Sequence, residues 1–226
     1  MKRLEQRSPH NGSKARFYIL SFFWRSIYLL RRDANSLYHL GNVYFAHGHP
    51  IKAMQLWNNV VAKDQSHSKA WHNLVQAAVS KEEWTLATTG LSSLCRLHPD
   101  HLEYATLFSQ ILKKHNRTND LEDLYLNYVD SVHKKWAITE LAMLYTRTNK
   151  EKEACTLLTP YVKDHPHDAY GWRLLGMNYM KLKNYPMALE ALQKSYRLHA
   201  DNEIKSWIVR IDRGLEKSKK HQININ

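Results

Sequence analysis

Glycine, proline and cysteine are all scarce in this sequence of 226 residues, which contains seven, six and two of them. So few turn-forming residues, together with the absence of long β-branched runs, favour an all-α protein whose helices are joined by short turns. Cys95 and Cys155 lie far apart, each within a helical pattern, so they do not form a disulfide framework. We expect two buried thiols in a reducing compartment, and therefore a cytoplasmic location.

The sequence motifs of the common enzyme classes are also missing. The chain contains no glycine-rich phosphate loop, no HExxH pair and no G-x-S-x-G turn. Fourteen histidines are present, but no cysteine pair with the spacing of zinc ligands accompanies them. We therefore predict a protein that is not an enzyme and that needs no metal and no cofactor.

Negative charge is in deficit, because the formal net charge of the chain is +12. Residues 1–33 contain eight lysines and arginines but only two acidic residues, Glu5 and Asp33. A basic N-terminal region suggests an acidic neighbour, whether a protein, a phospholipid surface or a nucleic acid. Improved solubility is the simpler alternative.

An internal repeat is the strongest positive signal, and residues 169–202 show it most clearly. This stretch reads as two amphipathic helices, with small residues where the backbones approach and large ones around them. The pattern consists of Trp172, Leu175, Gly176, Tyr179, Tyr185, Ala188, Leu192 and Ala200. Starts near residues 34, 68, 102, 135 and 169 are separated by 34, 34, 33 and 34 residues. They predict five helix-turn-helix units, 34–67, 68–101, 102–134, 135–168 and 169–201, of which the third is degenerate.

Close packing explains the small residues of the pattern. Gly41 and Gly176 on first helices are expected to face Ala53 and Ala188 on second helices. Val75 takes the place of the small residue in the second unit, so we expect the two helices of that unit to splay slightly.

These residues and their period resemble the tetratricopeptide repeat family over roughly residues 16–217. The resemblance implies a right-handed α-solenoid that acts as an adaptor without catalysis. It also implies that the first helices line a concave groove, which holds an extended peptide or a helix of a partner. The groove residues expected to bind the partner are Tyr38, Asn42, Phe45, Lys69, Asn73, Gln76, Trp136, Arg147, Tyr170 and Arg173.

The best-known groove of the family clamps the acidic C-terminal tails of heat-shock chaperones. Asn42 and Asn73 match the two asparagines of that clamp, whereas its cationic positions hold Tyr38, Glu103 and Leu107. We therefore do not expect chaperone-tail binding, although the two amides could still hydrogen-bond a peptide backbone.

Residues 16–33 form the least ordinary segment, which we predict to be an amphipathic N-terminal capping helix. Its largely apolar run from Phe17 to Leu30 would be roughly 21 Å long as a helix, shorter than the bilayer core of about 30 Å. A membrane-spanning helix is therefore not expected, and no small-residue cleavage site marks a secretory signal.

Two interpretations of this segment stay open. As a cap, it places Ile19, Phe23 and Ser26 in the second-helix positions of a truncated repeat, 34 residues ahead of the first unit. Its aromatic residues nevertheless cover more than one helix face, which indicates a second contact with a protein or a membrane interface. The residues expected to make that contact are Phe17, Tyr18, Phe22, Trp24, Arg25 and Tyr28.

The function predicted from these features is that of a protein-protein interaction scaffold, adaptor or complex-assembly factor. The alternatives are an accessory protein tethered at a membrane surface and an RNA-binding helical repeat protein. In the wider groove set, the basic residues Lys69, Lys114, Arg147 and Arg173 are partly offset by Glu103 and Glu140. The excess positive charge gathers instead at the termini, which argues against nucleic acid in the groove. The expected boundaries are a flexible basic tail 1–15, the capping helix 16–33, the repeats 34–201, a C-terminal capping helix 202–217 and a disordered tail 218–226.

Overall fold

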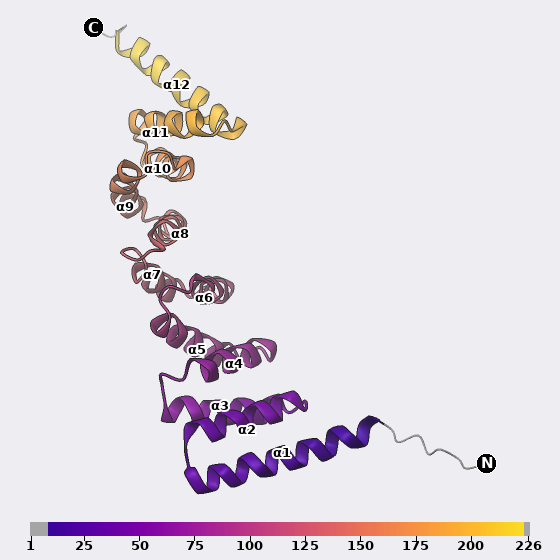
Figure 1. Cartoon of the computed structure of the whole chain (residues 1–226). Helices are drawn as coiled ribbons and strands as arrows, with labels where there is room; N and C mark the ends of the chain where they lie inside the picture. The colour runs from indigo at the N-terminus through magenta and orange to yellow at the C-terminus, as the bar shows by residue number, and fades with distance from the viewer. Residues whose placement is uncertain (1–8, 224–226) are drawn as a thin grey trace, which may run out of the picture. The chain divides into compact units, whose positions relative to one another are not determined.

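A computed structural model of the chain describes the backbone of residues 9–223 and the side chains of residues 13–216. Within this range every regular element is an α-helix, and there are twelve of them (Figure 1). The predicted all-α class is confirmed.

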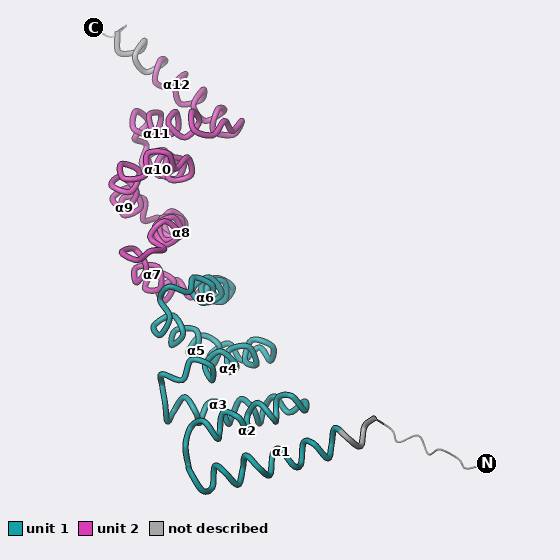
Figure 2. Tube along the Cα trace, in the orientation of Figure 1, with its two compact units in different colours: residues 1–115 teal, residues 116–226 magenta. Residues whose placement is uncertain are grey.

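The helices group into two compact units, residues 1–115 and 116–226 (Figure 2). Unit 1 contains α1 (Pro9–Arg31), α2 (Ala34–Ala46), α3 (Pro50–Lys63), α4 (Ser68–Ser80), α5 (Trp84–Leu97) and α6 (Leu102–Lys114). Unit 2 contains α7 (Thr118–Leu126), α8 (Lys134–Arg147), α9 (Glu151–Asp164), α10 (Ala169–Lys181), α11 (Tyr185–Leu198) and α12 (Asn202–Ile223). The boundary between the units falls inside the degenerate third repeat, so the period alone did not indicate it.

Both terminal helices are longer than expected. The helix α1 begins at Pro9 rather than at Arg16, so residues 9–15 are helical and do not belong to a flexible tail. The helix α12 continues to Ile223, past the expected end at residue 217. The rest of the two expected tails, residues 1–8 and 224–226, lies outside the described residues.

The repeat is visible in the backbone of the turns between first and second helices. One residue in each of these turns has a positive φ between 54° and 81°, a conformation that residues with a side chain rarely adopt. These residues are Gly48, Glu82, Asn116, Asn149 and Lys183, and their spacing of 34, 34, 33 and 34 residues reproduces the predicted period. In these five turns, glycine is used only at residue 48.

Two glycines mark the close approach of first and second helices. A Cβ atom added at Gly41 would lie 2.5 Å from Nε1 of Trp57, and one added at Gly176 would lie 2.7 Å from Cγ of Leu192. The residues nearest the two glycines are therefore large ones, and not Ala53 and Ala188 as predicted. In the second repeat the glycine at the close approach lies on the second helix instead of the first. A Cβ atom at Gly90, on the second helix, would lie 2.5 Å from Cγ2 of Val75 on the first. The small residue therefore stands on the opposite helix in this repeat, where it makes room for Val75.

The two chain ends are closed differently. On α12, Ile204 and Ile211 are buried and Trp207 packs partly buried beside them, while the opposite side of the helix is polar. The helix therefore caps its end of unit 2 as predicted. On α1, by contrast, no described residue is fully buried: Phe17, Leu20, Trp24, Ile27 and Tyr28 are half-buried and the other apolar residues are exposed.

Candidate functional site

The first helices of unit 1 carry a hydrogen-bonded cluster of polar side chains. The buried indole of Trp57 donates from Nε1 to Oδ1 of Asn42 at 3.2 Å. The same oxygen accepts from Nδ2 of Asn73 at 3.0 Å, and this nitrogen also lies 3.4 Å from the hydroxyl of Tyr38. Three residues predicted to line the groove, Tyr38, Asn42 and Asn73, are thus brought together across α2 and α4.

The indole fixes the orientation of both amides. Because an indole N–H can only donate, Asn42 must present its oxygen to Trp57, and its amino group points elsewhere. Because that oxygen accepts from Asn73, the second amide must present its amino group and keep its own oxygen free. No described residue pairs with Nδ2 of Asn42 or Oδ1 of Asn73. The pair therefore offers one donor and one acceptor, which is what a peptide bond can satisfy.

The other predicted groove residues of unit 1 surround this pair. Phe45 is 45 % exposed and packs against the ring of Trp57, with centroids 5.4 Å apart. Lys69 and Gln76 are exposed. Asn42 also lines a hollow of about 660 Å³ between α1 and α2, together with residues that were not predicted, among them Arg16 and His39.

The first helices of unit 2 present a more apolar surface. Tyr170 is 44 % exposed, and its hydroxyl lies 3.0 Å from Sδ of Met143 on α8. Burial raises the pKa of this phenol, so it stays protonated at neutral pH. Trp136 is half-buried, with its ring edge-on to Tyr125 at 5.4 Å. Arg147 is exposed.

Arg173, another predicted groove residue, makes contacts that the sequence did not predict. Its guanidinium group pairs with Asp201 at 3.2 Å and with Glu203 at 2.6 Å, and it lies over the ring of Trp207. These contacts join α10 to the start of α12. The positive charge of Arg173 is therefore already neutralised by two carboxylates of its own unit.

The six residues predicted for a second contact divide between two faces of α1. Phe17 packs edge-on against Tyr44 of α2, with centroids 5.5 Å apart, and Tyr28 packs against the core of unit 1. Trp24 stacks on His39 with centroids 4.3 Å apart. These three aromatic residues attach α1 to the repeats.

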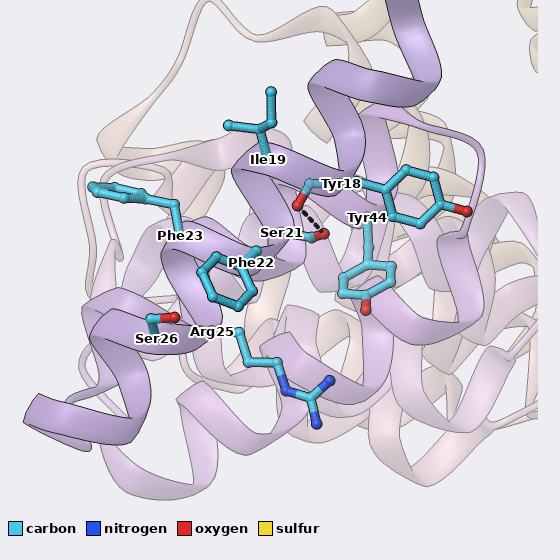
Figure 3. A pocket seen from close by; sticks show the side chains of 8 residues that line it. All are labelled: Tyr18, Ile19, Ser21, Phe22, Phe23, Arg25, Ser26 and Tyr44. Carbon is cyan, nitrogen blue, oxygen red and sulfur yellow. Dashed lines mark hydrogen bonds between the residues drawn. The ribbon is translucent and has the colours of Figure 1, made fainter. Parts of the chain in front are cut away.

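The remaining three residues, Tyr18, Phe22 and Arg25, line a hollow of about 730 Å³ on another side of α1 (Figure 3). Tyr18 is 68 % exposed and Phe22 is 74 % exposed. Ile19 and Phe23 share this surface and are also exposed. We call the surface formed by Tyr18, Ile19, Phe22, Phe23 and Ser26 the open face of α1.

Buried polar contacts in unit 2 were not anticipated. Asn178 is fully buried and accepts from the hydroxyl of Thr146 at 3.0 Å, which joins α8 to α10. The hydroxyl of Tyr145 donates to Glu122, and burial together with this bond raises the pKa of Tyr145 to about 12. Such contacts depend on which residues meet in space, so no local sequence signal reveals them.

Two classes of site are absent from the described part of the chain. No group of three or more histidine, cysteine, aspartate or glutamate residues in it is arranged to hold a metal ion. None of the helices within residues 9–223 combines the length and the apolar character that crossing a membrane requires.

Comparison with known proteins places the chain in a family. No protein-family model matches it. The TPR repeat-containing protein BH2049 of Halalkalibacterium halodurans is 44 % identical over 213 residues, which cover 94 % of this chain and 96 % of that protein.

Two solved structures share the fold. The crystal structure of YrrB, described as a TPR protein with an unusual peptide-binding site, is similar over 80 % of this chain and 94 % of YrrB, with a TM-score of 0.51 and 16 % identity. A structure of Naa15/Naa10 bound to HypK-THB is similar over 87 % of this chain and 31 % of that one, with a TM-score of 0.66 and 13 % identity. The extent and identity of the match to the bacterial relative, together with the repeated helix pairs, show that the chain belongs to the tetratricopeptide repeat family.

Proposed function

We propose that this protein is a non-catalytic scaffold that binds an extended peptide or a helix of a protein partner on its first helices. The observation that carries the proposal is the pair of oriented amides on α2 and α4. Asn42 offers a donor and Asn73 an acceptor, beside the hollow between α1 and α2. Main-chain groups of a bound peptide can satisfy both, and they do so without regard to the side chains of the peptide.

Side chains of the partner would be recognised by the aromatic and thioether groups nearby. Phe45 in unit 1 and Tyr170 with Met143 in unit 2 expose apolar surface on the first helices. Aromatic residues are those that most often dominate the energy of protein interfaces. YrrB, which shares this fold, is described as having a peptide-binding site, which is consistent with the proposal.

We also propose that the protein works in a reducing compartment, the cytoplasm. Burial raises the pKa of the Cys155 thiol to about 11, so it stays protonated and unreactive at neutral pH. Cys155 is buried as expected, whereas Cys95 is only partly buried, and the two do not form a disulfide with each other.

A tether to an anionic membrane surface is the second candidate function, because α1 exposes apolar residues and carries no acidic residue from Pro9 to Arg31. RNA binding on the first helices receives less support. The guanidinium of Arg173 is already paired with two carboxylates, which leaves Arg147 as the exposed arginine among the predicted groove residues of unit 2.

Co-purification from the native host, followed by mass spectrometry, tests the scaffold proposal. The tagged full chain should retain the same protein partner before and after nuclease treatment, and Tyr170→Ala should weaken its recovery several-fold. Tyr185→Ala, a similarly exposed tyrosine on the second helix α11, is the matched control and should leave recovery unchanged. Loss of all partners on nuclease treatment would contradict the proposal in favour of RNA.

A further inference from the structure

The helix α1 has the register of a second helix, and no first helix of the same repeat is among the described residues. Residues 34 positions before Ala53, Trp57 and Val60 of α3 are Ile19, Phe23 and Ser26. In α3 these three residues are between 0 % and 1 % exposed, as expected for a second helix covered by its own first helix. In α1, Ile19 is 68 % exposed and Phe23 is 51 % exposed. The open face of α1 therefore corresponds to a surface that is buried in the complete repeat.

The side of α1 that meets α2 agrees with this register. Leu20 lies 34 residues before Met54, which is buried in α3. Leu20 is half-buried, and it lines the hollow between α1 and α2. The helix α1 thus attaches to the first repeat by the side expected of a second helix, while its other apolar side is uncovered.

We propose that an acidic amphipathic helix of another protein packs on the open face of α1, in the position that the first helix takes in the complete repeats. The inference rests on the proposed scaffold function and specifies the second contact of that scaffold.

The shape of the repeat dictates what the partner helix must present. Phe23 corresponds to Trp57 in the first repeat and to Leu192 in the last. Both of those large residues face a glycine, at positions where an added Cβ would lie within 2.7 Å of them. A helix on the open face therefore needs a small residue opposite Phe23, with large apolar residues on either side of it to fill the hollow of about 730 Å³.

The charge of α1 specifies the chemistry of the partner. Between Pro9 and Arg31 the helix contains no acidic residue, and the arginines at positions 16, 25 and 31 accompany Lys14. Arg25 lines the hollow of the open face (Figure 3), and no carboxylate of the described residues pairs with it. Carboxylates at the edge of the partner helix would neutralise this charge and guide association.

The same argument disfavours a second copy of this chain as the occupant. Two α1 helices packed together would bring their cations into proximity without any compensating carboxylate of their own. The helix α12 does not offer a suitable surface either. Its residues 34 positions after Leu175, Gly176 and Tyr179 of the first helix α10 are exposed and mostly cationic. These are Val209, Arg210 and Arg213. Neither terminal helix therefore offers the acidic, small-residue surface that the open face requires.

A synthetic first helix provides the probe. The peptide has the sequence of residues 169–181, with Arg173→Glu and Lys181→Glu and with a hydrocarbon staple between positions 174 and 178, opposite Gly176. Fluorescence anisotropy with the full-length chain should show saturable binding that weakens with added salt. Placing tryptophan at the Gly176 position of the peptide should weaken binding at least tenfold, because the added ring would clash with Phe23.

Variants of the protein locate the binding site. Ile19→Asp should weaken peptide binding at least tenfold, whereas Ile51→Asp should not, although Ile51 on α3 is 66 % exposed and equally apolar. Equal binding of the glycine and tryptophan peptides, an equal effect of the two aspartate variants, or no binding at all would overturn the proposal.

Lipid vesicles distinguish a membrane surface from a helix. Vesicles of phosphatidylcholine with one quarter phosphatidylglycerol are sedimented with the full-length chain and with its Ile19→Asp variant. We expect no difference between the two in the amount of protein that sediments. If the variant sediments less, and the peptides show no dependence on the residue at position 176, the open face binds lipid and the proposal is wrong. Failure of the peptide test would leave the co-purification test of the first helices unaffected, because that test uses residues outside the open face.

Discussion

The indole of Trp57 and the amide of Asn42 form a hydrogen bond of 3.2 Å that joins the core of the first repeat to its candidate binding surface. Trp57 is 1 % exposed, so if this partner is lost its N–H cannot find water and keeps only its longer bond of 3.4 Å to the backbone carbonyl of Tyr38. Asn42 therefore has a structural role through its oxygen and a proposed binding role through its nitrogen.

Two substitutions at Asn42 separate these roles. Asn42→Leu removes the shorter of the two acceptors of the indole N–H and should lower the free energy of unfolding by about 0.5–1.5 kcal/mol, which is the usual net contribution of one hydrogen bond. Asn42→Asp keeps an acceptor for Trp57, so it should retain most of the stability, but it removes the donor and should weaken partner recovery. Chemical denaturation and co-purification measure the two effects. Equal loss of stability in both variants would show that the indole bond is unimportant.

Glu82 is a position where a substitution should stabilise the protein. Its φ of 59° is unfavourable for a residue with a side chain, and Gly48 occupies the equivalent turn of the first repeat. Glu82→Gly should raise the free energy of unfolding by about 0.5–1 kcal/mol, because relief of strain exceeds the entropic cost of glycine. Glu83→Gly is the control, since φ is −80° there and no strain is relieved. The midpoint of thermal unfolding should therefore rise for Glu82→Gly and should fall or stay unchanged for Glu83→Gly.

The same glycine-to-alanine change should have opposite effects at two positions of unit 2. At Gly176 the added Cβ would lie 2.7 Å from Leu192, so alanine should cost about 1–3 kcal/mol through overpacking. At Gly214 in α12 nothing lies within 4 Å of the added atom, so alanine should stabilise the helix by up to about 1 kcal/mol. Urea denaturation measures both. A neutral Gly176→Ala would mean that the helices of the last repeat are not closely packed.

Glu122 should make the stability of unit 2 depend on pH. A hydrogen bond from Lys150, helped by one from Tyr145 and opposed by burial, holds the pKa of Glu122 below its ordinary value. A carboxyl group of this kind stabilises the fold above its unfolded pKa, and the contribution is lost as the pH falls through the folded pKa.

Glu122→Gln should therefore lower the free energy of unfolding by about 0.5–1 kcal/mol at pH 7 and have almost no effect near pH 3. Urea denaturation at the two pH values tests this. Glu190→Gln removes only an exposed pair with Lys194 and should change stability by less than about 0.5 kcal/mol at either pH. A Glu122 effect that does not depend on pH would show that the ion pair contributes nothing.

Repetition explains which parts of the structure could be predicted. The 34-residue period located the helix pairs and the two glycines at their close approach, because both are consequences of local spacing. It did not identify the residues that these glycines face, since Trp57 and Leu192 stand where Ala53 and Ala188 were predicted. The family shown by the bacterial relative agrees with that prediction. The pairing of Arg173 with Asp201 and Glu203 could not be predicted, because no spacing rule says which neighbour a long charged side chain will reach.

The limits of the period are equally physical. Val75 alone predicted that the two helices of the second repeat splay slightly. Gly90 lies on the other helix and makes room for Val75, and the pattern of a single helix does not show such a pairing. The same period led to the recognition of α1 as a second helix. Its open face could be detected only from exposure, since Ile19 and Phe23 look like core residues in the sequence.

Site-specific photocrosslinking in the native host tests the central claim, that the first helices bind a protein partner. A benzophenone amino acid is placed at Tyr38 or Tyr170 on first helices, and at Ile51 or Met187, which are exposed on second helices. We predict that the first-helix positions crosslink to one and the same protein and that the second-helix positions do not. Crosslinking of that protein with equal yield at all four positions, or at the second-helix positions alone, would contradict the account.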